Sequence, residues 1–501
     1  MESSQHKQPL QGALSSSIHA ALAHTSEAAE QPRSWLVLAL LCSMQFILIL
    51  DTAIVIVGLP SIQRELGFDS GTLQWVVTGY SLAFGGFLLL GSRASDLFGR
   101  RFCFWVGLII FTLASLLGGI AQSQIMLVGG RLLQGLGAAI ISPAALALLM
   151  KSFAEGRERN RALGVWGAAS AGGGAAGIIV GSLLTELSWR WVFLVNVPIG
   201  IAAIVLVPLA LSESRGRTQG RLDLPGALLI TASLIGLVYG LSEAANKGFA
   251  EAGTLVPLVG GIGLLIVFLI LERRTQEALI PLHIFRRRTL VGGNLVAMLM
   301  LAILSGETFF LTLYLQQVRG SSPLEAGLAF LPQTLLIMVF SNAAARLVSH
   351  LGMRKMLIGA MVLLAAGAFL FVRLGTEGDY LSVVLPATLL LALGLGGGFV
   401  AASIAATTGV GDSDQGLASG LFNTVQQVGA AVGIAVLVTV ATAHTAHPGQ
   451  RDSVVIGYHW AFIAATIFAL VALLVALIVV RAPDLPGDTS NISRKEKRSN
   501  E

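Results

Sequence analysis

Charged side chains are scarce in this chain of 501 residues: Asp, Glu, Lys and Arg together make up 12% of it. Soluble globular domains contain about 25% charged residues. Hydrophobic residues account for 54% of the chain, and its mean hydropathy is +0.79. So few charges cannot cover the surface of a soluble core of this size, which excludes an ordinary soluble domain.

Cysteine and metal-ligating clusters are scarce as well. Cys42 and Cys103 are the only cysteines, and both fall in apolar segments, so a disulfide framework is not expected. His444, His447 and His459 lack the spacing of metal ligands, and no GxxxxGK[ST] phosphate-binding loop occurs. We therefore expect no metal ion, no cofactor, no ATP hydrolysis and no enzymatic activity.

The sequence instead contains many long runs of apolar residues. An apolar helix of about 20 residues is long enough to span the hydrocarbon core of a bilayer. Fourteen such segments predict an all-α polytopic membrane protein with 14 transmembrane helices. They lie at approximately 34–58, 73–92, 102–121, 124–150, 159–185, 190–212, 224–244, 253–272, 290–316, 323–349, 354–374, 381–409, 414–443 and 457–481.

The net charge of +5 indicates topology and not a nucleic-acid partner. An even number of spans places both termini on one side of the membrane. When that side is the cytoplasm, most of the 32 Lys and Arg residues fall in cytoplasmic loops and tails, as the positive-inside rule requires. We predict a multi-pass protein of the plasma membrane with both termini cytoplasmic.

Three charged residues, Asp51, Arg131 and Glu307, lie well inside predicted spans. With a helix rise of about 1.5 Å per residue, the two acids lie roughly 13 Å and Arg131 roughly 10 Å below the outer ends of their spans. An ionisable residue in a membrane normally faces a cavity or a partner and marks a pathway for substrates or protons. Asp51 and Arg131 could form a structural ion pair or a proton-coupling site.

The surroundings of Glu307 leave several roles open. It is followed by the aromatic residues Phe310 and Tyr314. A carboxylate beside aromatic faces could receive a lipophilic cation, it could exchange a proton, or it could be a neutral, hydrogen-bonded core acid. Other polar and aromatic residues could line a cavity or be structural. The full set of cavity candidates is Gln45, Trp75, Tyr80, Gln134, Phe310, Tyr314 and Gln317.

Four short stretches carry distinctive patterns. They are LDTAIVIVGLP (50–60) in the first span, SRASDLFGRR (92–101) after the second, RLLQGLGAA (131–139) in the fourth and AGGGAAGIIVGSLL (171–184) in the fifth. In the last of these, Gly173, Gly177 and Gly181 recur every fourth residue, a spacing that lets two helices approach closely.

In order and spacing, these stretches resemble the signature motifs of the major facilitator superfamily, in its fourteen-spanner drug:proton antiporter branch. The resemblance extends over about residues 34–480. Further stretches that carry it are WRWVFLVNVPIG (189–200), RLDLPGALL (221–229), YLQQVRGSSPLEAGLAFLP (314–332) and GLASGLFNTVQQVGAAVGIAVL (416–437). The sequence departs from the family pattern at Ile178, where a proline usually follows the glycine.

The resemblance implies a major facilitator fold of two six-helix bundles and two extra central helices. The stretch LVSHLGMRK (347–355) partly repeats the 92–101 motif, which also indicates two related halves. The expected divisions are a disordered cytoplasmic tail at 1–33, an N-terminal bundle at 34–212, two inserted transmembrane helices and linkers at 213–289, a C-terminal bundle at 290–481 and a cytoplasmic tail at 482–501.

The resemblance also implies an activity. We expect a secondary transporter that exports amphipathic or cationic small molecules across the membrane in exchange for protons, by alternating access. Asp51, Arg131 and Glu307 are then candidates for proton coupling and substrate contact. A gating role at the cytoplasmic side is implied for Asp96, Gly99, Arg100 and Arg101.

The expected partners are a small-molecule substrate, protons and the lipid bilayer, with no nucleic acid and a monomer as the functional unit. Two alternatives stay open. The first is a dedicated exporter of one native compound, such as an antibiotic, a siderophore or a lipid. The second is a membrane sensor or scaffold that transports nothing, which a lack of proton-coupled flux would support.

Overall fold

The computed structural model describes residues 8–69, 71–153, 156–211, 213, 223–248, 251–275, 282–376, 380–408, 410, 415–447 and 449–480. Within these ranges, 14 spans are long and apolar enough to cross a membrane, and each overlaps one predicted span. The prediction of an all-α polytopic membrane protein is confirmed. The predicted tail at 482–501 lies outside the described residues.

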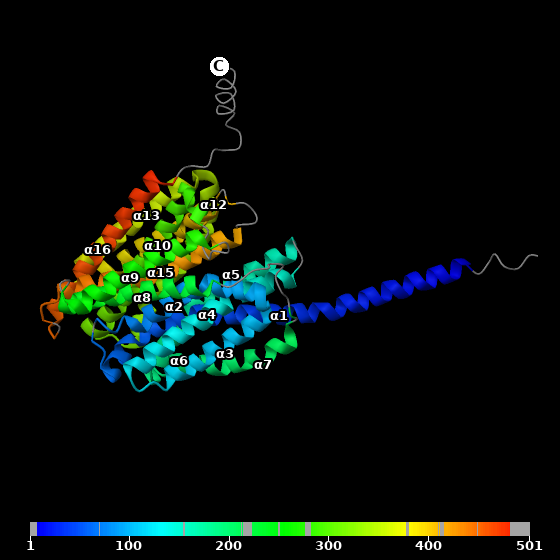
Figure 1. Ribbon diagram of the computed structural model, residues 1–501, viewed down its shortest axis with the longest axis horizontal. Coiled ribbons are helices and arrows are strands. Elements are labelled where there is room, and N and C mark those ends of the chain that lie inside the picture. Colours follow the sequence, from blue (N-terminus) through cyan, green and yellow to red (C-terminus); the bar gives the residue numbers. More distant parts are fainter. Residues whose placement is uncertain are drawn as a thin grey trace, which may run out of the picture.

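The helices fall into three groups along the chain, coloured from blue to red in Figure 1. The first half consists of α1 (Gln8–Leu66), α2 (Trp75–Phe98), α3 (Arg100–Gly119), α4 (Gln124–Ser152), α5 (Arg157–Leu187), α6 (Trp191–Leu194) and α7 (Asn196–Ala210). Two further helices follow, α8 (Leu224–Lys247) and α9 (Ala252–Arg274). The second half opens with the short η1 (Leu282–Arg286) and contains α10 (Arg288–Leu313), η2 (Tyr314–Val318), α11 (Pro323–Ala329), α12 (Leu331–Leu351), α13 (Met353–Leu370), η3 (Phe371–Arg373), η4 (Tyr380–Val384), α14 (Leu385–Thr407), α15 (Gln415–Ala443) and α16 (Arg451–Ile478).

α1 begins within the segment 1–33 that the sequence predicts as a tail. The helix starts at Gln8, and its first part projects beyond the bundle as the long blue helix of Figure 1. Alanine, leucine, glutamine and glutamate, which are common in this segment, are strong helix formers.

The packing of the first half recurs in the second. α1 packs on α5, α2 on α4 and α3 on α7, and the corresponding pairs α10–α15, α12–α14 and α13–α16 also pack on each other. The halves meet where α2 contacts α15 and α5 contacts α11 and α12. α8 and α9 pack together, and α8 lies against both α2 and α15. The repeated pattern is that of a major facilitator fold, with α8 and α9 placed beside the junction of the halves.

The predicted glycine face of α5 lies against α1. A Cβ added at Gly173, Gly177 or Gly181 would lie 2.5, 2.8 or 2.7 Å from the nearest atom of α1. The same packing recurs on α15, where a Cβ added at Gly429 or Gly433 would collide with Met298 or Ala302 of α10. Because glycine has no side chain, these positions allow α5 to pack closely on α1, and α15 on α10, in the two helix pairs that border the junction of the halves.

We expect Gly181→Ala to destabilise the protein, because the added methyl group would meet the backbone of α1 as well as a side chain. Overpacking of this kind costs about 1–3 kcal/mol in the free energy of unfolding. The control is Gly167→Ala on the same helix, where nothing lies within 4 Å of an added Cβ. Thermal unfolding in detergent should show a lower midpoint for Gly181→Ala only. Equal midpoints for the two variants would contradict the close packing.

Candidate functional site

The carboxylate of Asp51 on α1 accepts three hydrogen bonds from side chains of the first half. Arg131 Nη1 donates to Oδ2 at 2.6 Å, while Gln134 Nε2 and Asn196 Nδ2 donate to Oδ1 at 3.1 and 2.7 Å. The side chains of Asp51 and Arg131 are 0% and 1% exposed. A buried ion pair offsets its desolvation only with good geometry and further hydrogen bonds, and this network supplies both.

The guanidinium of Arg131 has further partners. Nη1 also donates to Gln134 Oε1 at 2.9 Å, and Nε donates to the carbonyl oxygen of Val76 at 2.8 Å. Its Cζ lies 4.4 Å from the centroid of the Tyr80 ring, within the range of a cation–π interaction. Gln134 Nε2 donates in addition to Ser115 Oγ at 2.8 Å. The charge of Arg131 is thus held in place from α1, α2 and α4.

Asn196 is a member of this network that the sequence analysis missed. It is the first residue of α7, after Val195, which links α6 to α7, and its side chain reaches Asp51 on α1. Its Nδ2 donates to Asp51, while its Oδ1 is buried without a hydrogen bond in the described part of the chain. A lone amide between apolar residues in WRWVFLVNVPIG was the available signal, because a buried amide needs a polar partner.

Glu307 lies on α10 in the second half, and its side chain is buried. Gln333 Nε2 of α12 donates to Oε2 at 3.0 Å, and Oε1 has no hydrogen-bond partner among the described residues. Asp51 and Glu307 therefore have separate partners, each in its own half. The two carboxylates have similar predicted depths in the membrane, but only Asp51 is paired with Arg131.

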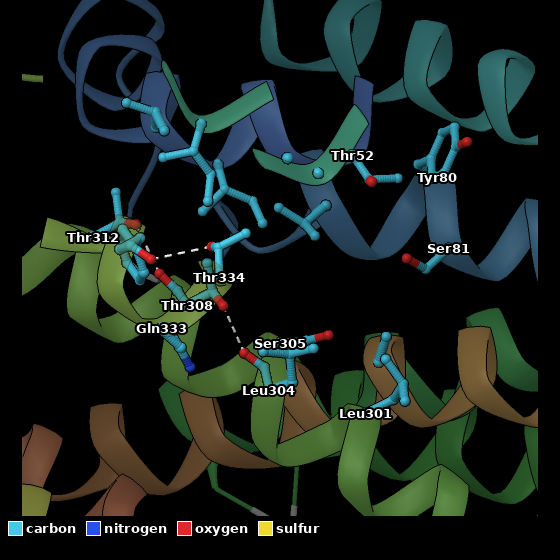
Figure 2. A pocket seen from close by; sticks show the side chains of 18 of the residues that line it. Thr52, Tyr80, Ser81, Leu301, Leu304, Ser305, Thr308, Thr312, Gln333 and Thr334 are labelled. Atoms are coloured by element: carbon cyan, nitrogen blue, oxygen red, sulfur yellow. Dashed lines mark hydrogen bonds between the residues drawn. The ribbon is translucent and has the colours of Figure 1, made fainter. Parts of the chain in front are cut away.

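A cavity of about 300 Å³ lies between the two halves, as Figure 2 shows from close by. It is lined from α1, α2, α4 and α5 on one side and from α10, α12 and α15 on the other. Its polar lining residues are Thr52, Tyr80, Ser81, Arg131, Ser305, Thr308, Thr312, Gln333, Thr334 and Gln427.

Neither buried carboxylate is among the described residues that line the cavity, but each is bound to a residue that is. Asp51 accepts from the lining residue Arg131, and Glu307 accepts from the lining residue Gln333. A molecule in the cavity would therefore touch the hydrogen-bond partner of each acid. Ile178, which stands where the family has proline, also lines the cavity, on an α5 that continues without interruption past it.

The cavity candidates from the sequence fall in different places. Tyr80 lines the cavity, and Gln134 lies in the network behind Arg131. Gln45 is half-buried on α1 and is not among the lining residues. Trp75 packs on the α8 residue Tyr239, with ring centroids 6.3 Å apart. Only one of these four candidates borders the cavity.

The remaining three candidates lie in the second half outside the cavity. Phe310 packs in the core against Tyr458, with centroids 5.2 Å apart. The hydroxyl of Tyr314 donates to the carbonyl oxygen of Gly375 at 2.7 Å. Gln317 is exposed. Phe310 and Tyr314 therefore have structural surroundings, and neither forms an aromatic wall for the cavity.

Gln317 and its neighbour Gln316 connect the two halves at one end of the bundle. Gln316 Nε2 donates to the carbonyl oxygen of Val57 at 2.9 Å, and Gln317 Nε2 donates to Gln63 Oε1 at 2.7 Å. Both donors lie on η2, a π-helical turn at the end of α10. π-helical turns occur frequently at functional sites. These bonds tie α1 to η2 across the junction of the halves.

The residues of the SRASDLFGRR stretch lie at the other end of the bundle. Asp96 near the end of α2 and Arg100 at the start of α3 form an ion pair, with Oδ1 and Nη2 3.0 Å apart. Gly99 separates α2 from α3 with φ of +112°, a backbone conformation that favours glycine. The guanidinium of Arg101 donates from Nη1 to the carbonyl oxygen of Leu211 at 3.1 Å.

Glu213 is a partner of this stretch that the sequence analysis did not name. Its Oε1 accepts from the backbone N–H of Arg101 at 3.2 Å, and its Oε2 accepts from that of Phe102 at 3.1 Å. The Nε of Arg101 lies 3.8 Å from the same carboxylate. A carboxylate is favourable at a helix N-terminus, where backbone N–H groups are unpaired. Glu213 therefore fastens the chain after α7 to the start of α3.

Comparison with known proteins supports the same fold and relates the chain to named proteins. A family model described as Major Facilitator Superfamily matches residues 41–434. The puromycin resistance protein pur8 of Streptomyces alboniger is 41% identical over 457 residues, which cover 89% of this chain and 91% of that protein. The cephamycin export protein CmcT of Amycolatopsis lactamdurans is 40% identical over 464 residues, which cover 91% and 95%.

Solved structures resemble the fold at much lower sequence identity. The crystal structure of the peptide transporter POT in complex with sulfate aligns with a TM-score of 0.65 at 14% identity, over 89% of this chain and 95% of that chain. At that identity the likeness concerns the fold alone. With its 14 spans, its two halves of matching packing and its close relatives, the chain is a multi-pass membrane protein that belongs to the major facilitator superfamily of transporters.

Proposed function

We propose that this protein exports amphipathic drugs or other toxic small molecules across the plasma membrane in exchange for protons, by alternating access. The observation that carries the proposal is the coupling of the cavity to two buried carboxylates. Arg131 and Gln333 line the cavity, and they hydrogen-bond Asp51 and Glu307. A substrate that displaces either donor changes the environment of an acid, which is the physical requirement for substrate and proton to compete.

The two halves supply the moving parts of alternating access. The cavity lies at their junction, and the hydrogen bonds from Gln316 and Gln317 link the halves at one end of the bundle. Rocking of one half against the other would break these bonds and open that end. The loop that carries Asp96, Arg100 and Arg101 lies at the other end, and its ion pair and its hydrogen bond to Leu211 lie within the first half. This loop would therefore move with the first half, and that end would open and close in the opposite phase. Each state is then favoured by the contacts that it alone makes.

The membrane orientation follows from the distribution of basic residues. We place the end with residues 96–101, together with both termini, in the cytoplasm, because the positive-inside rule assigns basic loops to that side. A single chain carries both halves and the whole cavity, so a monomer suffices for transport. The partners of the protein are then one small molecule, protons and the bilayer.

A dedicated exporter of one compound is the second candidate. The relatives named for puromycin and cephamycin support it, since each of those names refers to one antibiotic. Broad multidrug export and dedicated export use the same cavity and differ in how many ligands it accepts.

The proposal is tested by substrate-driven proton movement in inside-out membrane vesicles. A pH gradient, acidic inside, is imposed and followed with a fluorescent pH probe while antibiotics and amphipathic dyes are added. We expect at least one compound to dissipate the gradient in vesicles that contain the protein and not in vesicles that lack it. Movement of compounds without movement of protons would overturn the exchange mechanism. An absence of both would favour a sensor or scaffold.

A further inference from the structure

The described residues of the cavity wall offer no negative charge to a substrate. Among the described residues that line it, Arg131 is the only one with an ionised side chain, and its charge is paired with Asp51 at 2.6 Å. Glu307 lies behind Gln333, which occupies the cavity side of that pair. A cation entering the cavity would lose hydration without gaining a counter-charge, and an unpaired buried charge is costly.

The wall does offer many neutral hydrogen-bonding groups, and they come from both halves. Thr52, Thr308 and Thr334 donate their hydroxyl hydrogens to carbonyl oxygens of their own helices at 2.6, 2.8 and 3.1 Å. A hydroxyl that donates in this way keeps its oxygen lone pairs for another donor. These three threonines therefore present acceptors to a ligand.

Further groups have no partner within the part of the chain that the structure describes. Ser81 of α2 and Ser305 of α10 lie on opposite walls in Figure 2, and Gln427 of α15 also lines the cavity. The Tyr80 hydroxyl is buried and makes no hydrogen bond, although the ring borders the cavity. A buried polar group without a hydrogen bond is rare in native structures and calls for a ligand or water. These groups can donate as well as accept.

Apolar side chains make up the rest of the lining, among them Ile56, Ile178, Leu301 and Ile337. The volume of about 300 Å³ lies at the lower end of the range of small-molecule pockets, about 300–1,000 Å³. Among its described lining residues, the cavity thus combines apolar side chains, dispersed neutral hydrogen-bonding groups and one cation, Arg131, which is paired with Asp51.

We propose that this cavity selects uncharged amphipathic molecules that carry hydroxyl or amide groups, in preference to cations. This inference rests on the proposed export function and specifies its substrate class. It narrows the amphipathic or cationic substrates that the family resemblance implies, and it departs from the hypothesis that Glu307, beside aromatic faces, receives a lipophilic cation. The structure puts Gln333 on the cavity side of Glu307 and packs Phe310 into the core.

The test uses two dansyl amphiphiles with the same alkyl linker, one ending in a neutral diol and the other in a trimethylammonium group. Their pH-gradient-driven uptake into inside-out vesicles is measured by dansyl fluorescence. We expect the diol to be taken up roughly tenfold faster. A tenfold ratio corresponds to a difference of about 1.4 kcal/mol in binding free energy. Equal or faster uptake of the cation would overturn the inference and leave the export function standing. Uptake of neither probe by vesicles in which an antibiotic does dissipate the pH gradient would overturn the inference alone, whereas the export function fails only if no compound moves.

A charge-introducing variant makes the test independent of probe permeability. Gln427→Glu would place a carboxylate in the cavity wall, and we expect it to reverse the preference in favour of the cation. Asn423→Asp is the matched control, since it adds the same charge one turn away on α15 at an exposed position outside the lining. The control should keep the preference of the unchanged protein. An unchanged preference in properly inserted Gln427→Glu protein would show that charge in the cavity does not decide selectivity.

Discussion

Replacement of Asp51 by asparagine is expected to abolish proton-coupled transport and to lower stability. The carboxylate is fully buried and accepts from Arg131, Gln134 and Asn196. Removing its charge leaves the guanidinium of Arg131 buried without its counter-ion, and breaking a buried pair costs about 3–5 kcal/mol. Substrate-driven dissipation of the pH gradient should be lost, and the midpoint of thermal unfolding in detergent should fall.

A double variant separates the two effects. Asp51→Asn combined with Arg131→Gln removes both charges, and replacing a whole ion pair by neutral groups is much less destabilising than breaking it. We expect the double variant to recover most of the thermal stability and none of the proton-coupled transport. Recovery of transport along with stability would mean that the pair is a structural element only, the alternative left open by the sequence.

Glu307→Gln is expected to uncouple transport from protons while the protein remains folded. The carboxylate and the amide have similar shapes, and Gln333 can still donate a hydrogen bond to the new side-chain carbonyl. The amide cannot bind and release a proton, so the second half loses its titratable group beside the cavity. Uptake driven by a pH gradient should fall to the level of empty vesicles, while exchange of labelled for unlabelled substrate should continue.

The control for this variant is Glu186→Gln, which neutralises an exposed carboxylate near the end of α5 outside the cavity lining. Its gradient-driven uptake should match that of the unchanged protein. Gradient-driven uptake that survives Glu307→Gln would place proton coupling with Asp51 alone. Loss of exchange together with gradient-driven uptake would instead indicate that Glu307 is needed for substrate binding.

Features that depend on composition and local spacing were predictable. Apolar runs of bilayer length gave all 14 spans. The fourfold spacing of Gly173, Gly177 and Gly181 predicted a close helix contact, and the structure supplies α1 as the partner. Asp51 and Arg131 were singled out because charges are expensive in a membrane, and they do meet at 2.6 Å.

Features that depend on which side of a helix faces the cavity were not predictable. Trp75 lies against α8, Phe310 lies in the core and Gln317 is exposed, although the sequence suggested all three for the cavity. In a soluble protein the apolar face of a helix points inward, but in a membrane the lipid is as apolar as the core. The pattern of apolar residues then says little about orientation, and polar residues point to a cavity or to a partner without saying which.

The sequence by itself determined the class of the protein, the number of spans, the family and the few charged residues that lie inside the membrane. These features depend on composition, length and local motifs. Only the tertiary structure decided which residues contact one another. It joined Asn196 to Asp51 across 145 positions and Glu213 to α3 across more than a hundred. It also put Gln333 on the cavity side of Glu307. Contacts between helices distant in sequence depend on their packing angles and rotations, which no local pattern encodes.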